Sequence, residues 1–148
     1  MTAFVIDACI AVKWFYEESS RDAAKKYLHS GLKRIAPDLI ILEYVNAVRK
    51  KVVLKQLTQE EADIGFAIFM KRKNILFSTL YPANELMFTA YELSKKLNNH
   101  PIPDCLYLTL AERENACLVT ADRKFNNHVM MSQFSHLIAW VEDPPEMK

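Results

Sequence analysis

The chain has 148 residues, of which 51% are hydrophobic and 25% charged, so it has the composition of one globular domain and not of a disordered protein. Its two glycines, Gly31 and Gly65, are too few for the glycine-rich phosphate loops of dinucleotide-binding and P-loop proteins. The formal net charge of +1 gives no overall basic signal for nucleic-acid binding.

The three cysteines and four histidines show none of the spacings of a zinc site, and the histidines are expected to have surface or packing roles. The cysteines lie in apolar stretches, which is typical of buried free thiols in a reducing compartment and predicts a cytoplasmic location. The first residues are interrupted by Asp7 and Lys13 and do not resemble a secretory signal. No run reaches the ~18 uncharged apolar residues that a membrane span needs.

In the N-terminal half, short apolar runs alternate with segments of helical spacing. Thr58 and Glu61 form a capping box, which predicts that a helix starts there. The elements predicted here are strand Ala3–Ile6, helix Ala8–Tyr16, a helix capped by Ser19 or Ser20 and ending at Gly31, strand Lys33–Ala36, a helix opened by Pro37 and Asp38 with Ile41, Val45, Val48 and Val52 on one face, and a helix from Thr58 to about Arg72.

In the C-terminal half, Pro82 and Pro103 mark helix starts, because proline is favoured in the first helical turn. Asp122 opens a short basic segment for which no element is predicted. The elements predicted here are strand Ile75–Thr79, helix Pro82–Leu97, helix Pro103–Asn115, strand Cys117–Thr120 and strand Leu137–Val141.

Strands that alternate with helices, without hairpin signals, predict an α/β fold. We expect a central parallel β-sheet of four to five strands, flanked by helices on both faces. No linker or repeat is visible, so residues 1–148 are expected to form a single domain. In such sheets ligands bind beyond the carboxyl ends of the strands, which is where candidate site residues are sought.

Four acidic residues are predicted to meet at that edge. Asp7 and Asp122 follow predicted strands, while Glu43 and Asp104 lie in the first turns of predicted helices. Each has an ordinary structural explanation: a helix N-cap for Asp7 and Asp122, the helix dipole for Asp104, and a solvated surface for Glu43. Their placement on one edge by independent elements favours a functional cluster.

The chemistry of such a cluster is restricted. Carboxylates within a few ångströms repel one another, and some take up protons unless a cation neutralises them. Oxygen ligands without histidine or cysteine suit Mg²⁺ or Mn²⁺, ions that keep several waters and also bind phosphate oxygens. The residues therefore predict metal-dependent hydrolysis of phosphate esters.

Three stretches resemble PIN-domain nucleases, and more narrowly the VapC toxins of toxin–antitoxin systems: VIDACIAVKWF, PDLIILEYVNAVRK and IPDCLYLTLAERENACLVTADRKF. The resemblance covers nearly the whole chain and is weakest between about Leu54 and Asn98. It places the family's acidic residues on the four acids above, and it implies that Thr120 orients them through a hydrogen bond.

The resemblance implies an endoribonuclease that depends on Mg²⁺ or Mn²⁺, acts on an RNA substrate as a homodimer and is inhibited by a small cognate antitoxin. Asp7 and Asp104 are expected to be the principal ligands of one ion, with Glu43 and Asp122 completing the shell partly through water. Some relatives have a further acidic residue where this chain has Asn126–Asn127, so one tightly bound ion is expected at rest.

Other readings concern partners and competing functions. The resemblance favours an apolar groove for an antitoxin helix, made of Tyr44 and those residues of the run Trp14–Tyr16 that do not enter the core. Arg123 and Lys124 directly follow Asp122 and are placed to meet a phosphate backbone. A catalytically idle PIN-fold scaffold and a stand-alone PIN nuclease without antitoxin stay open as alternatives. A haloacid-dehalogenase-type phosphatase is excluded, because the chain lacks its D-x-D motif after the first strand.

Overall fold

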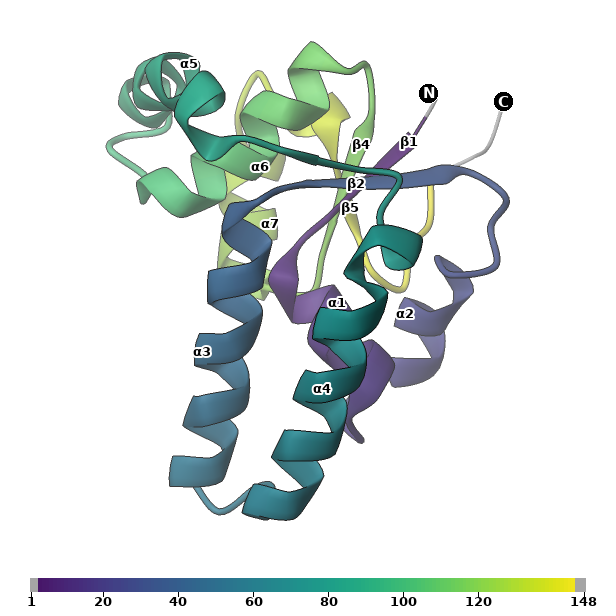
Figure 1. Cartoon of the computed structure of the whole chain (residues 1–148). Helices are drawn as coiled ribbons and strands as arrows, with labels where there is room; N and C mark the ends of the chain where they lie inside the picture. The colour runs from purple at the N-terminus through teal and green to yellow at the C-terminus, as the bar shows by residue number, and fades with distance from the viewer. Residues whose placement is uncertain (1–2, 146–148) are drawn as a thin grey trace.

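The computed structural model describes residues 3–145, which form a five-stranded sheet in the order β3-β2-β1-β4-β5 (Figure 1). All neighbouring strands are parallel. The predicted α/β class and parallel sheet are confirmed. The strands are β1 (Ala3–Ile6), β2 (Lys33–Pro37), β3 (Thr79–Tyr81), β4 (Cys117–Thr120) and β5 (Ile138–Trp140).

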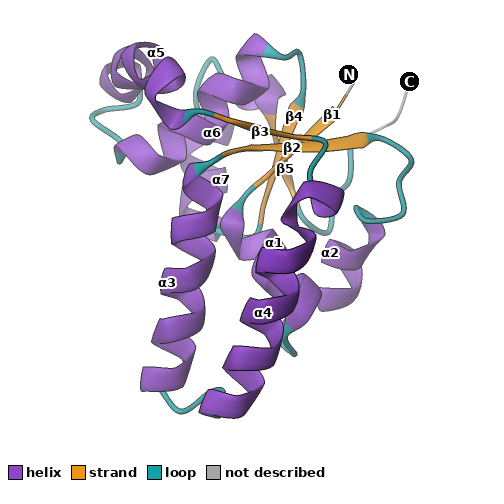
Figure 2. Ribbon diagram, viewed as in Figure 1, coloured by secondary structure: helices purple, strands orange, loops and turns teal. Residues whose placement is uncertain are grey.

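Helices flank both faces of the sheet (Figure 2). The strand order steps from β1 to β3 in one direction and then from β4 to β5 in the other, so right-handed crossovers send the connecting helices to opposite faces. No helix within residues 3–145 combines the length and the apolar character needed to cross a bilayer. The helices are α1 (Ala8–Phe15), α2 (Arg21–Lys26), α3 (Leu39–Val53), α4 (Gln59–Leu76), α5 (Ala83–Lys96), α6 (Ile102–Arg113), α7 (Arg123–Met130) and the short 3₁₀ helix η1 (Ser135–Leu137).

The central strands β1 and β4 bring distant parts of the chain together at one edge. Every residue of both strands is buried, as their near-continuous apolar sequences require in a sheet covered on both faces. Phe4 pairs with Cys117 and Ile6 with Val119, so the two strands end at the same level. The Asp7 backbone N–H then donates to the Val119 carbonyl at 3.3 Å, which places the segment after β4 beside Asp7.

Three elements differ from the sequence-based expectation. α2 ends at Lys26 and not at Gly31, because the chain leaves the helix in a series of turns after Tyr27. β3 begins at Thr79 and not at Ile75, because α4 continues through Leu76 and leaves Ile75 75% exposed on the helix surface. The basic segment after Asp122 forms helix α7, for which no element was predicted. Its sequence is mostly polar, and its apolar face is too short to show helical spacing. Its first turn is capped by Asp122, since the Phe125 N–H donates to Asp122 Oδ1 at 3.1 Å.

The α3–α4 hairpin projects from the sheet and is held by aromatic packing (Figure 1). Tyr44 stacks on Phe69 with ring centroids 3.8 Å apart, and the Tyr16 hydroxyl donates to the Ala62 carbonyl at 3.1 Å. Gly65 permits this approach, because a Cβ at that position would lie 2.2 Å from the Tyr16 hydroxyl oxygen. The predicted capping box at the start of α4 is confirmed.

The aromatic run after β1 belongs to the core. Trp14 and Tyr16 are buried, and Tyr44 is fully buried on α3. Phe15 is half-buried and makes edge-on contacts with the rings of Tyr44 and Phe69. Tyr44 and Trp14 therefore do not line a groove, because they pack α1 against the hairpin. Phe15 and Tyr16 do line a cavity of about 330 Å³, together with residues of α4 such as Ile64.

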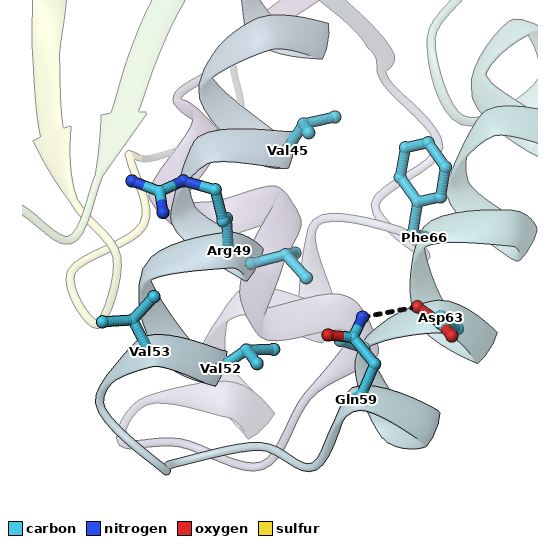
Figure 3. A pocket seen from close by; sticks show the side chains of 9 residues that line it. Val45, Arg49, Val52, Val53, Gln59, Asp63 and Phe66 are labelled. Atoms are coloured by element: carbon cyan, nitrogen blue, oxygen red, sulfur yellow. Dashed lines mark hydrogen bonds between the residues drawn. The ribbon is translucent and has the colours of Figure 1, made fainter.

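A different apolar groove, of about 330 Å³, lies between α3 and α4 (Figure 3). Val45, Val52 and Phe66 line it from the two helices, and Arg49 and Asp63 are the charged residues of its lining. The hairpin thus keeps part of its apolar surface open to solvent.

Candidate metal centre

Asp7 lies at the carboxyl end of β1, and its side chain is buried. The Thr120 hydroxyl, at the end of β4, donates a hydrogen bond of 2.7 Å to Asp7 Oδ2. Although Asp7 occupies the N-cap position of α1, its side chain makes no capping hydrogen bond. Burial raises the pKa of Asp7, the Thr120 hydrogen bond opposes this rise, and the charge of Asp122 adds to it. The Asp7 carboxylate is therefore oriented chiefly by Thr120, with a smaller contribution from Cys9 in the first turn of α1.

Thr120 links the ends of the two central strands. Besides donating to Asp7, its hydroxyl oxygen accepts a hydrogen bond of 3.0 Å from the Asp122 N–H. The Cys9 sulfur lies 3.7 Å from the same hydroxyl and accepts from the Ala121 N–H at 3.3 Å. The resemblance implied an orienting hydrogen bond from Thr120, and the geometry contains it.

The two carboxylate oxygens of Asp122 have different environments. Oδ1 caps helix α7, which is the ordinary structural role considered for this residue. Oδ2 makes no hydrogen bond with any residue in the range 3–145, and the side chain is exposed at the edge. One oxygen thus remains open to a ligand or to solvent.

Glu43 reaches the same edge from α3 and is half-buried. Its Oε1 is buried and has no hydrogen-bond partner within residues 3–145. Burial raises the pKa of Glu43, the nearby Tyr107 hydroxyl opposes this rise, and the charges of Asp7 and Asp104 add to it. The hydroxyl does not complete a well-aligned hydrogen bond, since it also has no partner in that range. A buried polar oxygen normally has a partner, so Glu43 Oε1 is available to a cation or a donor.

Asp104 lies in the first turn of α6, where the helix dipole favours its ionised form. Burial, followed by the charges of Asp7 and Asp122, outweighs the dipole and raises the pKa of Asp104 to about 7. The side chain keeps 26% of its surface exposed. Close to neutral pH, this carboxyl therefore holds its proton about half of the time unless a cation compensates its charge.

His100 contacts Asp104 and His128 contacts His100, so these two histidines have polar contacts in addition to the packing role expected for them. His100 Nε2 lies 2.7 Å from Asp104 Oδ2, and His100 Nδ1 lies 2.8 Å from His128 Nδ1. The His100 ring stacks on Phe125 with centroids 5.1 Å apart. Burial lowers the pKa of His100, the charge of Asp122 opposes this change, and Lys124 adds to it.

The four acids form one electrostatic group. The charge of Asp7 raises the pKa of both Glu43 and Asp104, and the charge of Asp122 raises the pKa of Asp7 and Asp104. The structure thus brings together the side chains that four separate elements carry to the edge. Carboxylates that raise each other's pKa in this way are relieved by a bound cation.

The donor set suits an ion that keeps its waters. No three His, Cys, Asp or Glu side chains in the described part of the chain are grouped tightly enough to enclose a metal by themselves. Mg²⁺ commonly binds proteins through one or two carboxylates and retains several waters. Glu43 Oε1, a buried oxygen without a partner among the described residues, is a group that such an ion could use.

Helix α7 carries further polar groups near Asp122. Arg123 and Lys124 are exposed in its first turn, and the Arg123 guanidinium lies over the Trp140 ring, 3.7 Å from its centroid. Asn126 follows Asp122 by one helical turn, and its buried Oδ1 has no hydrogen-bond partner in the range 3–145. Positive charge thus stands directly beside the acidic edge.

The sequence was compared with models of known protein families, and one model matches it. The model of the PIN domain matches residues 4–129. The chain belongs to the PIN domain family. This PIN domain includes all four acids and Thr120 within the matched residues, and PIN domains are generally nucleases. Among curated proteins, no match to the chain is found.

Sequence reasoning missed several side chains of the PIN domain's acidic edge. Tyr107 has a faint signal, since it follows Asp104 by three residues and so shares its face of α6. His100 precedes Asp104 by four residues, but it lies before the start of α6 at Ile102, so helical spacing does not place it. His128 has no local signal, because its contact with His100 spans 28 residues.

Proposed function

We propose that residues 1–148 form a single PIN nuclease domain, an endoribonuclease that depends on Mg²⁺ or Mn²⁺ and works in the cytoplasm. The observation that carries the proposal is the group of four electrostatically coupled carboxylates at one edge, with Glu43 Oε1 buried and unpaired among the described residues. The free thiols of Cys9, Cys105 and Cys117 agree with a reducing compartment.

In this proposal Asp7 and Asp104 are the principal metal ligands. Glu43 and Asp122 complete the shell, partly through water, and Thr120 keeps the Asp7 carboxylate in place. When bound, a divalent cation neutralises the carboxylates, polarises the scissile phosphate and acidifies a water. The carboxylates would orient a water for attack on phosphorus and accept its proton. As the new P–O bond forms, the bond from phosphorus to the 3′-oxygen breaks, the 3′-oxygen takes a proton from solvent and leaves as a hydroxyl, and the other product keeps a 5′-phosphate. Arg123 and Lys124 hold the phosphate backbone beside the cut.

The decisive experiment is RNA cleavage by the variant Asp104→Asn, which keeps the size of the side chain and removes its charge. We expect a loss of activity of at least about 100-fold with Mg²⁺ or Mn²⁺, comparable to the loss of one electrostatic stabiliser. Glu112→Gln is the matched control, because Glu112 is exposed on the same helix. Full activity of Asp104→Asn, or undiminished cleavage in excess chelator, would show that the proposal is wrong.

A catalytically idle PIN scaffold is the alternative from a different functional class. Such a scaffold has no need for coupled, partly buried carboxylates, which cost folding free energy when no cation is bound. The same assay separates the two functions: a scaffold binds RNA or protein but gives no cleavage in the wild-type chain at any concentration of Mg²⁺ or Mn²⁺.

The narrower proposal is that the enzyme is the toxin of a toxin–antitoxin pair. The groove between α3 and α4 supports it, because Val45, Val52 and Phe66 offer an apolar surface of the kind that an amphipathic helix covers. The test is to look for a small open reading frame directly upstream, to co-express its product with this chain and to measure RNA cleavage. We expect inhibition, relieved at least about ten-fold by Phe66→Glu but not by Ile75→Glu at the exposed end of α4. Absence of an inhibiting partner would leave a stand-alone nuclease.

A homodimer is proposed through helix α5. Met87, Phe88 and Tyr91 lie on one face of this helix and are exposed, Phe88 by 81%. Burying such a stripe against a second copy removes apolar surface from water. Sedimentation should give a dimer for the wild type and a monomer for Phe88→Glu; a monomeric wild type at micromolar concentration would remove this part of the proposal.

A further inference from the structure

His100 and His128 form a hydrogen-bonded chain that ends on Asp104. The chain runs from His128 Nδ1 to His100 Nδ1 at 2.8 Å, and from His100 Nε2 to Asp104 Oδ2 at 2.7 Å. Both distances lie in the range of well-formed hydrogen bonds. His128 comes from α7 and Asp104 from α6, so the chain joins two helices through the side chain that lies between them.

The ring of His100 is held from several sides. The backbone carbonyl of His100 accepts a hydrogen bond of 2.6 Å from the Ser94 hydroxyl. The Cys105 thiol also donates to this carbonyl, at 3.8 Å. The ring itself stacks on Phe125, and only 8% of the residue is exposed. A ring fixed by packing and hydrogen bonds at both nitrogens has little freedom to rotate.

The chemistry of the three groups assigns the hydrogens. In its ionised form, the form that binds a metal, Asp104 only accepts hydrogen bonds, so in that state His100 Nε2 carries the hydrogen that lies between the two side chains. A neutral imidazole has one N–H, which leaves His100 Nδ1 as an acceptor. His128 Nδ1 must then be the donor to it. Each contact thus fixes the tautomer of the next ring.

We infer that His100 is a positioning residue for Asp104 and that His128 holds His100 in the required tautomer. The inference rests on the proposed function, in which Asp104 is a metal ligand. His100 occupies Oδ2 and so presents Oδ1 to the ion. Imidazoles and carboxylates that orient metal ligands in this way typically contribute 10–100-fold to metal affinity.

The first test does not depend on catalysis. Nitrogen-15 NMR of the metal-free wild-type protein at about pH 8 reports which ring nitrogens carry hydrogen, and we expect Nε2–H for His100 and Nδ1–H for His128. A scalar coupling across the hydrogen bond between the two Nδ1 atoms should also be detected. A His100 ring without hydrogen on Nε2, or rings that show no coupling, would overturn the inference.

The second test measures the affinity for Mn²⁺ by titration calorimetry. His100→Phe keeps a ring to stack on Phe125 but removes the donor, so the Kd should rise about ten-fold. His100→Gln places an amide donor near Asp104 and should recover most of the affinity. His29→Gln is the matched control, because His29 is exposed. Equal Kd values for wild type and a folded His100→Phe variant would contradict the inference.

The same titration separates the inference from the proposed function. If Asp104→Asn binds Mn²⁺ as tightly as the wild type, the metal-ligand role of Asp104 is wrong and the proposed function falls. If Asp104→Asn weakens binding while His100→Phe does not, the proposed function stands and only the positioning role of His100 falls.

Discussion

Replacing Asp104 by asparagine should stabilise the metal-free protein at alkaline pH. The pKa of Asp104 rises from its ordinary 3.8 to about 7, because the carboxyl is buried near the charges of Asp7 and Asp122. A rise of about three units corresponds to at most about 4 kcal/mol, at about 1.4 kcal/mol a unit. Since the folded state binds the proton more tightly than the unfolded chain, stability is present below about pH 4 and is lost as the pH rises to about 7. Asparagine removes this loss and still offers an acceptor to His100.

The assay is urea unfolding in the presence of a chelator, at about pH 5 and about pH 8. Between these values the wild type should lose about 2–3 kcal/mol more than Asp104→Asn, which lacks the titrating group. Glu112→Gln, an exposed acid on the same helix, should follow the wild type. A variant that loses as much stability as the wild type over this range would refute the electrostatic reasoning.

Adding the cation to the same proteins extends the test. At ten times its Kd, a ligand that binds only the folded state stabilises it by about 1.4 kcal/mol. Mg²⁺ should give this stabilisation to the wild type at about pH 8 and much less at about pH 5, where Asp104 is protonated. Equal stabilisation of Asp104→Asn and wild type would mean that the ion binds elsewhere.

Three further changes test other contacts. Gly65→Ala places a Cβ 2.2 Å from the Tyr16 hydroxyl oxygen and should cost about 1–3 kcal/mol in urea unfolding, whereas Ala67→Ser on the exposed face of α4 should cost little. Thr120→Val removes the hydrogen bond to Asp7 and should reduce kcat about ten-fold with little change in KM, while Thr120→Ser should keep the wild-type rate. Arg123→Ala should weaken RNA binding. It should also reduce by about one the slope of the logarithm of the binding constant against the logarithm of the salt concentration, as measured by fluorescence anisotropy.

The fold was largely predictable because its two central strands, β1 and β4, are unambiguous in the sequence. β1 and β4 are short apolar runs that are buried on both faces. Asp7 follows β1 directly, and Asp122 follows β4 after one residue. The capping box of Thr58 and Glu61 marks the start of α4 in the sequence as it does in the structure. These signals are local, so they need no knowledge of what packs against them.

Tertiary packing decided the features that sequence reasoning placed wrongly. Ile75 has the β-branched character of a strand residue, yet the chain stays helical there and turns extended only at the buried Phe77. On α3 the buried face is centred on Ile40, Tyr44 and Val48, because Tyr44 must reach Phe69 on α4. The face predicted from the sequence included Ile41, Val45 and Val52, which are only half-buried in the structure.

The candidate site was predictable in its acids but not in their surroundings. The strand–aspartate pattern and the first turns of helices locate Asp7, Asp104 and Asp122 from local sequence alone. The two histidines were not placed, because the contact between His100 and His128 depends on how α6 and α7 pack together. Long-range contacts of this kind leave no periodic trace in the sequence.

The low glycine content has a counterpart in the backbone. Positions with positive φ are taken by other residues, among them Asn98 with φ 55°, Asn99 with φ 59° and Asn115 with φ 49°. Asparagine tolerates this conformation better than most residues with a side chain. The helix ends near α5 and α6 therefore turn without glycine.

The pairing of β1 with β4 also determines when the acidic edge can assemble during biosynthesis. Asp7 leaves the ribosome before Thr120, which orients its carboxylate and follows 113 residues later. At about 5–20 residues per second, that interval lasts roughly 6–20 s. A nascent chain, or a product of interrupted translation that stops before β4, carries Asp7 without the strand that positions it. Only a chain translated past residue 122 can bring all four acids together.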